Sequence, residues 1–74
     1  MNIIKPIQNQ CKINNITYSN PVINLDNIIS LNKIDEIDDE EMFGIIFVGV
    51  DGMKYVWRFE DRETRDFEFS LHFN

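Results

Sequence analysis

The sequence predicts a mainly β fold, a small antiparallel sheet or meander built around a hairpin at residues 43–60. Three observations favour it. The chain has 12 Ile and 9 Asn but no Ala in 74 residues, a composition that is poor for helices, whereas Ile favours strands and Asn favours turns. Apolar and polar residues alternate in several stretches. Dipeptides typical of tight turns separate these stretches.

The length predicts a single domain, residues 1–74, since a chain this short cannot close a second core. One cysteine, Cys11, excludes an intramolecular disulfide and favours a reducing compartment. No apolar run approaches the roughly 18 residues of a membrane span, and the N-terminus lacks the pattern of a signal peptide. We therefore expect a cytoplasmic protein.

A first hairpin is predicted near the N-terminus. Residues 7–13 alternate, Asn14-Asn15 offers a two-residue turn of residues that tolerate positive φ, and residues 16–18 continue as the second strand. This pairing places Cys11 opposite Tyr18. Ile13 and Ile16 then face each other across the turn.

Two further extended segments are expected at 22–25 and 28–34, with a turn at 26–27 between them. They are followed by Asp35–Glu41, in which six of the seven residues are acidic. A strand there would place like charges side by side. We therefore predict a solvated loop or a single helical turn for this run.

The central hairpin has the clearest local pattern. Residues 43–50 are apolar, Asp51-Gly52 is a dipeptide typical of a two-residue type I′ turn, and residues 53–60 alternate apart from Val56. Such a turn would place Ile46 opposite Trp57. Because paired residues point to one face of a sheet, the predicted core face carries Val48, Val50, Ile46, Met53, Tyr55, Trp57 and Phe59.

In the same register, the second face of this hairpin carries Phe43, Ile45, Phe47 and Val56 beside charged residues. One interpretation is that the N-terminal hairpin covers this face as a second layer. The other is an exposed apolar contact surface, which a homodimer could use.

The C-terminal segment, residues 67–73, also alternates with period two. A five-residue loop at 61–65 would pair it with residues 53–59 and direct its large apolar side chains to the core, so a strand is preferred. The alternative is an α+β fold with a short helix after residue 61, because residues 63–66 are not typical of a strand.

The net charge of −6 comes from 13 acidic and 7 basic residues and is uneven. Residues 1–33 carry +2, whereas residues 34–74 carry −8. Phosphate backbones and anionic membranes repel such a chain, because both are bound by clustered Lys and Arg. We expect no direct nucleic-acid or membrane binding, and a protein partner with a basic surface.

No catalytic or metal-binding pattern is found. His72 is the only histidine and Cys11 the only thiol, too few for a common zinc site. The alternation predicts that His72 points from a strand into solvent, and Ser70 beside it lacks the remaining parts of a nucleophilic site. The acidic run has no glycine and is interrupted by Ile37, unlike a calcium loop. We expect no enzyme activity, metal or cofactor.

The predicted partner-binding surface consists of carboxylates that could occupy a basic groove in place of phosphates. Its residues are Asp35, Glu36, Asp38, Asp39, Glu40 and Glu41, extended by Asp61, Glu63 and Asp66.

In size, acidity and Ile/Asn-rich composition, the chain resembles the small orphan proteins encoded by phages and mobile elements of low-GC bacteria, and Asp35–Glu41 is the local feature that fits. Some of those proteins are anti-CRISPR inhibitors that block the basic nucleic-acid channel of an effector. The resemblance implies a non-enzymatic inhibitor or regulator. The alternative function is an interaction or homodimerisation module that uses the face formed by Phe43, Ile45, Phe47 and Val56.

Overall fold

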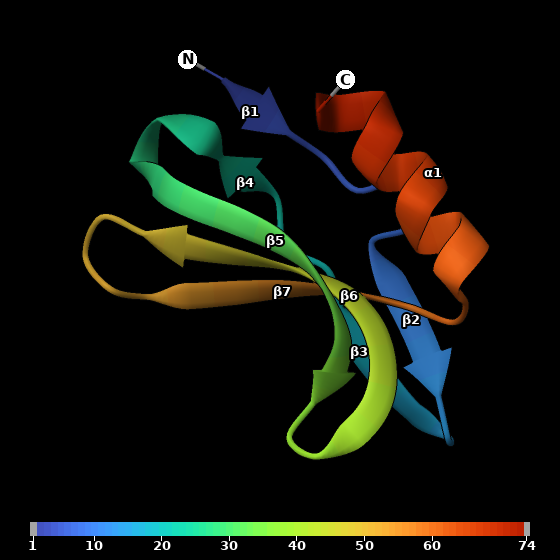
Figure 1. Ribbon diagram of the computed structural model, residues 1–74. Coiled ribbons are helices and arrows are strands. Elements are labelled where there is room, and N and C mark those ends of the chain that lie inside the picture. Colours follow the sequence, from blue (N-terminus) through green and yellow to red (C-terminus); the bar gives the residue numbers. More distant parts are fainter. Residues whose placement is uncertain (1, 74) are drawn as a thin grey trace.

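The computed structural model describes residues 2–73, and within them seven β-strands precede one α-helix (Figure 1). The mainly β, antiparallel fold is confirmed, and it ends in a short helix. In chain order the elements are β1 (Ile3–Ile4), β2 (Gln10–Ile13), β3 (Ile16–Ser19), β4 (Ile23–Asn24), the 3-10 turn η1 (Leu25–Asn27), β5 (Ile28–Ile37), β6 (Glu40–Gly49), β7 (Lys54–Phe59) and α1 (Arg62–Phe73).

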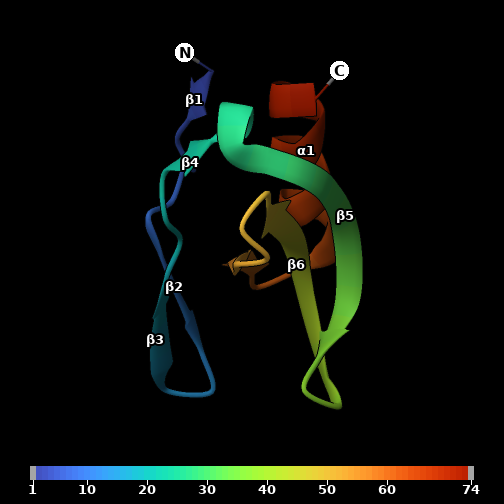
Figure 2. The ribbon, with the colours of Figure 1, turned by 90° about the vertical axis from the view of Figure 1, so that its left-hand side faces the viewer.

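The strands form three antiparallel groups. β1 pairs with β4, β2 with β3, and the largest sheet has the order β5-β6-β7. Figure 2 shows the N-terminal strands as one layer, with β5, β6 and α1 on the other side. The core lies where these parts meet.

The β2–β3 hairpin is confirmed, including its register. Asn14 and Asn15 form the turn with φ angles of 52° and 66°, which are the left-handed values that a type I′ turn requires and that Asn tolerates. Cys11 lies opposite Tyr18, as predicted, and the Cys11 thiol is buried.

The β6–β7 hairpin is confirmed, but its predicted register is wrong by one residue. The Gly49 N–H donates to the Met53 carbonyl over 2.7 Å, and the Gly52 N–H donates to the Gly49 carbonyl over 3.0 Å. Gly52 has a φ of 86°. The turn therefore has three residues, 50–52, and the pattern is a type I turn followed by a left-handed glycine bulge. Trp57 consequently lies opposite Ile45 and not Ile46.

This one-residue shift exchanges the two faces of β6. Ile45 and Phe47 lie on the face of Trp57 and are 0% exposed. The apolar contact face predicted from Phe43, Ile45, Phe47 and Val56 is therefore wrong, because Val56 pairs with Ile46 on the opposite face. The core residues predicted on β6 and in the turn are wrong for the same reason: Ile46 and Val48 are half-buried on that opposite face, and Val50 and Met53 are exposed.

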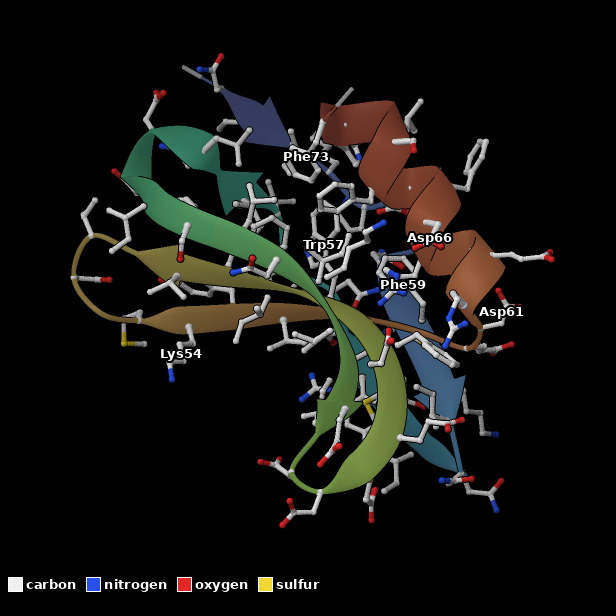
Figure 3. All side chains as sticks on the ribbon, in the orientation of Figure 1. Lys54, Trp57, Phe59, Asp61, Asp66 and Phe73 are labelled. Atoms are coloured by element: carbon white, nitrogen blue, oxygen red, sulfur yellow. The ribbon has the colours of Figure 1, made fainter. Side chains whose placement is uncertain are left out.

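The core is centred on Trp57, which is confirmed as fully buried together with Phe59. The Phe47 and Trp57 rings meet edge to face with centroids 5.0 Å apart, an arrangement that adds to the stabilisation from area burial. The indole N–H donates to the Pro21 carbonyl over 2.6 Å, so its polar atom is satisfied. Figure 3 shows Trp57 between the sheet and α1. The buried cluster consists of Ile23, Ile45, Phe47, Trp57 and Phe59, with Ile4, Leu25, Ile28, Leu31, Tyr55, Phe69 and Phe73 packed against it.

The C-terminal segment is helix α1, so the strand preferred at 67–73 is wrong and the alternative, a helix after residue 61, is confirmed. The Asp61 carboxylate accepts a hydrogen bond from the Thr64 N–H over 2.8 Å and so caps the helix. The side chains of α1 that face the rest of the protein follow a helical spacing. Three of them are polar, so the sequence does not show the hydrophobic period that is typical of a helix. The inward-facing side chains are Arg65, Glu68, Phe69, His72 and Phe73.

Asn20 attaches the N-terminal layer to the edge of β7. Its side-chain oxygen accepts from the Arg58 N–H over 2.8 Å, and its amide donates to the Arg58 carbonyl over 3.2 Å and to the Gln8 carbonyl over 3.1 Å. The side chain therefore acts as a short strand partner. Beside it, the Arg58 guanidinium lies over the Tyr18 ring, 4.5 Å from its centroid. Tyr18 of the β2–β3 hairpin therefore covers Arg58, a residue of the face of the central hairpin that this N-terminal hairpin was predicted to cover.

Arg65 attaches α1 to the irregular part of β5. At Asp35 the pairing of β5 with β6 is irregular, because two residues of β6, Met42 and Phe43, stand opposite this one residue. Such a bulge leaves backbone groups without ladder partners. The buried Arg65 guanidinium donates to the Ile34 carbonyl over 2.7 Å, to the Gly44 carbonyl over 3.4 Å and to Asp35 over 2.9 Å. Its Nε donates to Asp66 over 2.7 Å.

Replacing Arg65 by Ala should lower the free energy of unfolding by about 2 to 3 kcal/mol, because buried acceptors and Asp66 lose a charged donor. Urea denaturation followed by Trp57 fluorescence measures this. Arg62→Ala is the matched control: its side chain is exposed and 3.8 Å from the same Asp35, so its loss should be below about 1 kcal/mol. Equal losses for the two variants would contradict a role of Arg65 as the helix anchor.

Candidate functional site

The acidic run forms a hairpin, so the predicted loop or helical turn is wrong. β5 extends to Ile37, and β6 begins at Glu40. Asp38 and Asp39 form the two-residue turn with φ angles of 52° and 66°, the same values as in the Asn14-Asn15 turn. Like charges do lie side by side, because Glu36 pairs with Glu41.

The acidic run forms strands, despite its charge, because apolar side chains beside it pack against β6. Side-chain atoms of Ile34 and Ile37 lie over Gly44, within 3.5 Å of the position that a Cβ would occupy there. This packing holds the two strands together beyond the Asp35 bulge. The carboxylates point into water, where the repulsion of a cross-strand pair such as Glu36 and Glu41 is only about 0.2 to 1 kcal/mol.

Five carboxylates form what we call the acidic tip. All five are exposed, and no salt bridge within the described residues includes any of them. Between residues 36 and 41 there is no basic residue. Figures 1 and 2 show the β5–β6 turn at the end of the molecule away from α1 and from both chain ends. The acidic tip consists of Glu36, Asp38, Asp39, Glu40 and Glu41.

Two of the other carboxylates predicted to bind a partner are paired with basic side chains of the same chain. Asp35 and Asp66 share the Arg65 guanidinium, and Asp66 also lies 3.5 Å from the Lys33 ammonium. The hydrogen bond from Arg65 is the main reason why the pKa of Asp66 lies below its ordinary value. These two acids therefore already have basic partners within the fold.

Asp61 and Glu63 lie at the start of α1, where negative charge stabilises the helix dipole. The backbone hydrogen bond from Thr64 to Asp61 lowers the pKa of that carboxyl group. Figure 3 shows Asp61 and Asp66 beside the helix, apart from the β5–β6 turn. The structure thus divides the predicted site into the acidic tip and a helix-side group with structural roles.

A buried acid–base pair, Glu68 and His72, was missed by sequence reasoning. His72 is not directed into solvent as predicted: its side chain is 14% exposed, and its ring centroid is 5.4 Å from that of Trp57. Glu68 is 2% exposed, and its Oε1 accepts from the Ile7 N–H over 3.0 Å. Its Oε2 lies 3.7 Å from the His72 Nε2. Burial raises the pKa of Glu68 above its ordinary value.

This pair joins the N-terminal segment to α1 and faces the core, so it has a structural role. Two surface hollows of about 220 and 390 Å³ lie elsewhere, around Ile28, and neither is lined by Glu68, by His72 or by any charged side chain. Among residues 2–73 there is no group of three or more His, Cys, Asp or Glu side chains placed to hold a metal ion.

Comparison with known proteins identifies no relative, since no family model, curated protein or solved structure matches the chain. In the described part of the chain, α1 is both too short and too polar to cross a membrane. The function must therefore be argued from the surfaces of this structure.

Changing Asp38 to Asn and Asp39 to Gly should raise the free energy of unfolding by about 1 kcal/mol. Asn-Gly is the preferred type I′ sequence, and glycine adopts the left-handed conformation without strain. Asn15→Gly is the matched control, because it creates the same dipeptide at the same φ angles without changing charge. Urea denaturation of both variants separates relief of backbone strain from relief of charge repulsion. No gain in the Asp38/Asp39 variant would contradict a strained, self-repelling turn.

Glu68 should make stability depend on pH. Because its pKa in the folded protein is above the ordinary value of 4.5, the folded state binds this proton more tightly than the unfolded chain does. Its contribution is present below pH 4.5 and is lost as the pH rises through the raised pKa. Glu68→Gln keeps the acceptor for Ile7 and should remove this decline. Denaturation midpoints measured from acidic to neutral pH test it, and an unchanged pH profile would contradict the assignment.

Proposed function

We infer that the chain is a non-enzymatic inhibitor or regulator that binds a basic protein through its acidic tip. The observation that carries this proposal is the set of five exposed carboxylates, at the end of a long hairpin, that form no salt bridge with any other residue between 2 and 73. The fold uses Asp35, Asp61 and Asp66. Within residues 2–73 the carboxylates of the tip form no comparable salt bridge or helix cap.

The tip also has features that work against stability. Two non-glycine residues, Asp38 and Asp39, adopt left-handed backbone conformations, and Glu36 lies directly opposite Glu41. Each feature is unfavourable by a modest amount. Locally unfavourable backbone conformations and charge pairs are concentrated at functional sites, where the residues are selected for binding and not for the stability of the fold. They support a role for the tip in contact with another molecule.

The partner that fits best is a protein whose Lys and Arg side chains bind nucleic acid. In such a groove the carboxylates of the tip take the positions of phosphate oxygens and form charge-assisted hydrogen bonds. The net charge of −6 attracts a basic surface from a distance and raises the association rate. Binding of this kind weakens as salt screens the charges.

A finer form of the proposal is an anti-CRISPR type of inhibitor from a phage or mobile element, acting in the cytoplasm. It is supported by the resemblance in size, acidity and composition. In this form, the partner is a nucleic-acid-guided effector, and the tip competes with the strand that the effector would bind.

Retention of partners by the immobilised chain from a nuclease-treated bacterial lysate tests the proposal. At low salt the wild type should retain basic proteins, which a salt gradient then releases. The variant with Asp38→Asn and Asp39→Gly should retain them at least about tenfold less, through lost charge contacts. The matched control combines Asp26→Asn with Glu63→Gln, which removes the same charge elsewhere and should behave as the wild type.

Competition shows whether the retained proteins are bound at a nucleic-acid site. Adding single- and double-stranded nucleic acid to the loaded resin should release them, since both ligands require the same basic groove. Two results would contradict the proposal: equal retention by the tip variant and the wild type, or retention that neither salt nor nucleic acid reduces.

A further inference from the structure

Two buried polar atoms on the inner side of α1 face each other without forming a hydrogen bond. Among residues 2–73, Oε2 of Glu68 and Nε2 of His72 are closed to solvent and have no hydrogen-bond partner. They lie 3.7 Å apart, about 0.9 Å more than the length of a charge-assisted N–H···O bond. Buried polar groups are nearly always paired, so this arrangement requires an explanation.

A single proton held between the two atoms makes the pair neutral. Glu68 and His72 are four residues apart, on adjacent turns of one helix face, so a small side-chain rotation brings the two atoms to hydrogen-bond distance. Without this proton, Glu68 carries a negative charge at 2% exposure. This state is unfavourable, because burial removes the hydration of a carboxylate.

The second oxygen of Glu68 attaches the N-terminal segment to α1. Its Oε1 accepts from the Ile7 N–H over 3.0 Å, where the connection from β1 to β2 passes beside α1 (Figure 1). In the described part of the chain, this is the one hydrogen bond that residues 5–7 form. The attachment of this connection to α1 therefore depends on the state of Glu68.

Both ends of the connection are held independently of Glu68. At one end, β1 pairs with β4. At the other end, the Asn20 side-chain amide donates to the Gln8 carbonyl over 3.1 Å, and the Asn20 N–H donates to the Asn9 carbonyl over 2.8 Å. Residues 5–7 can consequently leave α1 while β1 and β2 remain in place.

Few groups influence the charge of Glu68. The facing group on α1 is His72, and the facing group on the N-terminal segment is the uncharged Ile7 N–H. Lys5 of that segment is exposed, and the Trp57 ring of β7, next to His72, is uncharged. No other ionisable side chain among residues 2–73 shifts the pKa of Glu68. Burial outweighs the hydrogen bond from Ile7, which favours the carboxylate, so the pKa of Glu68 is raised.

We propose that Glu68 and His72 form a proton-dependent switch, which attaches residues 5–7 to α1 when it holds a proton and releases them when it does not. On the acidic side, the pair takes one proton from water and holds it between Oε2 and Nε2. On the basic side, the proton returns to water, and residues 5–7 move away from α1 so that the carboxylate becomes hydrated. Because the pKa of Glu68 lies above its ordinary value of 4.5, attachment is complete below pH 4.5 and is lost as the pH rises through the raised pKa.

This release is a local opening and differs from unfolding of the whole chain. The pairing of β6 with β7 and the contacts of Arg65 with β5 do not involve residues 5–7. The opening therefore leaves the core closed and exposes little apolar surface. Denaturant acts in proportion to the surface that is exposed, so it should have almost no effect on the opening.

Amide hydrogen exchange followed by NMR tests the proposal, with each rate compared with that of an unstructured chain at the same pH. The protection of the Ile7 amide should fall as the pH rises from 4.5 toward neutral, by up to about tenfold per pH unit, the limit for the loss of one proton. Dilute urea should leave the exchange of Ile7 unchanged. It should accelerate the exchange of Phe47, which is 0% exposed in β6.

Glu68→Gln keeps an acceptor for the Ile7 N–H but has no proton to lose, so the protection of Ile7 should no longer depend on pH. Glu63→Gln is the matched control, because Glu63 is an exposed glutamate of the same helix, and this variant should behave as the wild type. Trp57 fluorescence reports whether each variant is folded.

The wild type gives a second measurement that requires no variant. The carbon NMR signals of the Glu68 carboxyl group and of the His72 ring should change at the same pH values, since a shared proton titrates as a property of the pair. Separate titration of the two groups would overturn the proposal. So would an Ile7 protection that does not vary with pH in the wild type, that still varies in Glu68→Gln, or that responds to urea as Phe47 does.

Discussion

The pairing of β6 with β7 is the constraint on which the rest of the structure depends. It places Ile45 and Phe47 with Trp57 and Phe59 on one face, which α1 and the N-terminal strands cover. A shift of one residue would turn Ile45 and Phe47 toward solvent. The three-residue turn, with Gly52 at a φ of 86°, sets this register. The burial of Trp57 then determines where the helix and the first strands can dock.

The parts of the fold that follow from local rules could be predicted from the sequence. Asn14-Asn15 specifies a type I′ turn, and the alternation around it set the β2–β3 register correctly. The β6–β7 register could not be settled this way, because Asp51-Gly52 also fits a three-residue turn with a glycine bulge. Val50 does not decide between the two, because valine is compatible with the strand of a two-residue turn and, as here, with an exposed position in a three-residue turn.

The strand preferred at 67–73 and the loop or helical turn predicted for the acidic run are wrong, because long-range contacts override the local pattern, whereas the alternative of a helix after residue 61 is confirmed. The inner face of α1 includes Arg65, Glu68 and His72, whose partners come from β5, the N-terminal segment and the core. Nothing local indicates these partners. Likewise, the carboxylates between Glu36 and Glu41 argue against a strand, but Ile37 packing over Gly44 holds one in place. The same tertiary contacts divide the acidic residues into those that support the fold and those that form no salt bridge in the described part of the chain.

The Asn20 side chain has a consequence for how this sheet can associate. By bonding to both backbone groups of Arg58, it occupies the outer edge of β7, so a strand from another molecule cannot pair along β7 past this point. Open-ended growth of a β-assembly requires two free edges, one at each side of the sheet. With the Asn20 side chain bonded to one residue of the β7 edge, the largest sheets of two folded molecules cannot join continuously through their β7 strands.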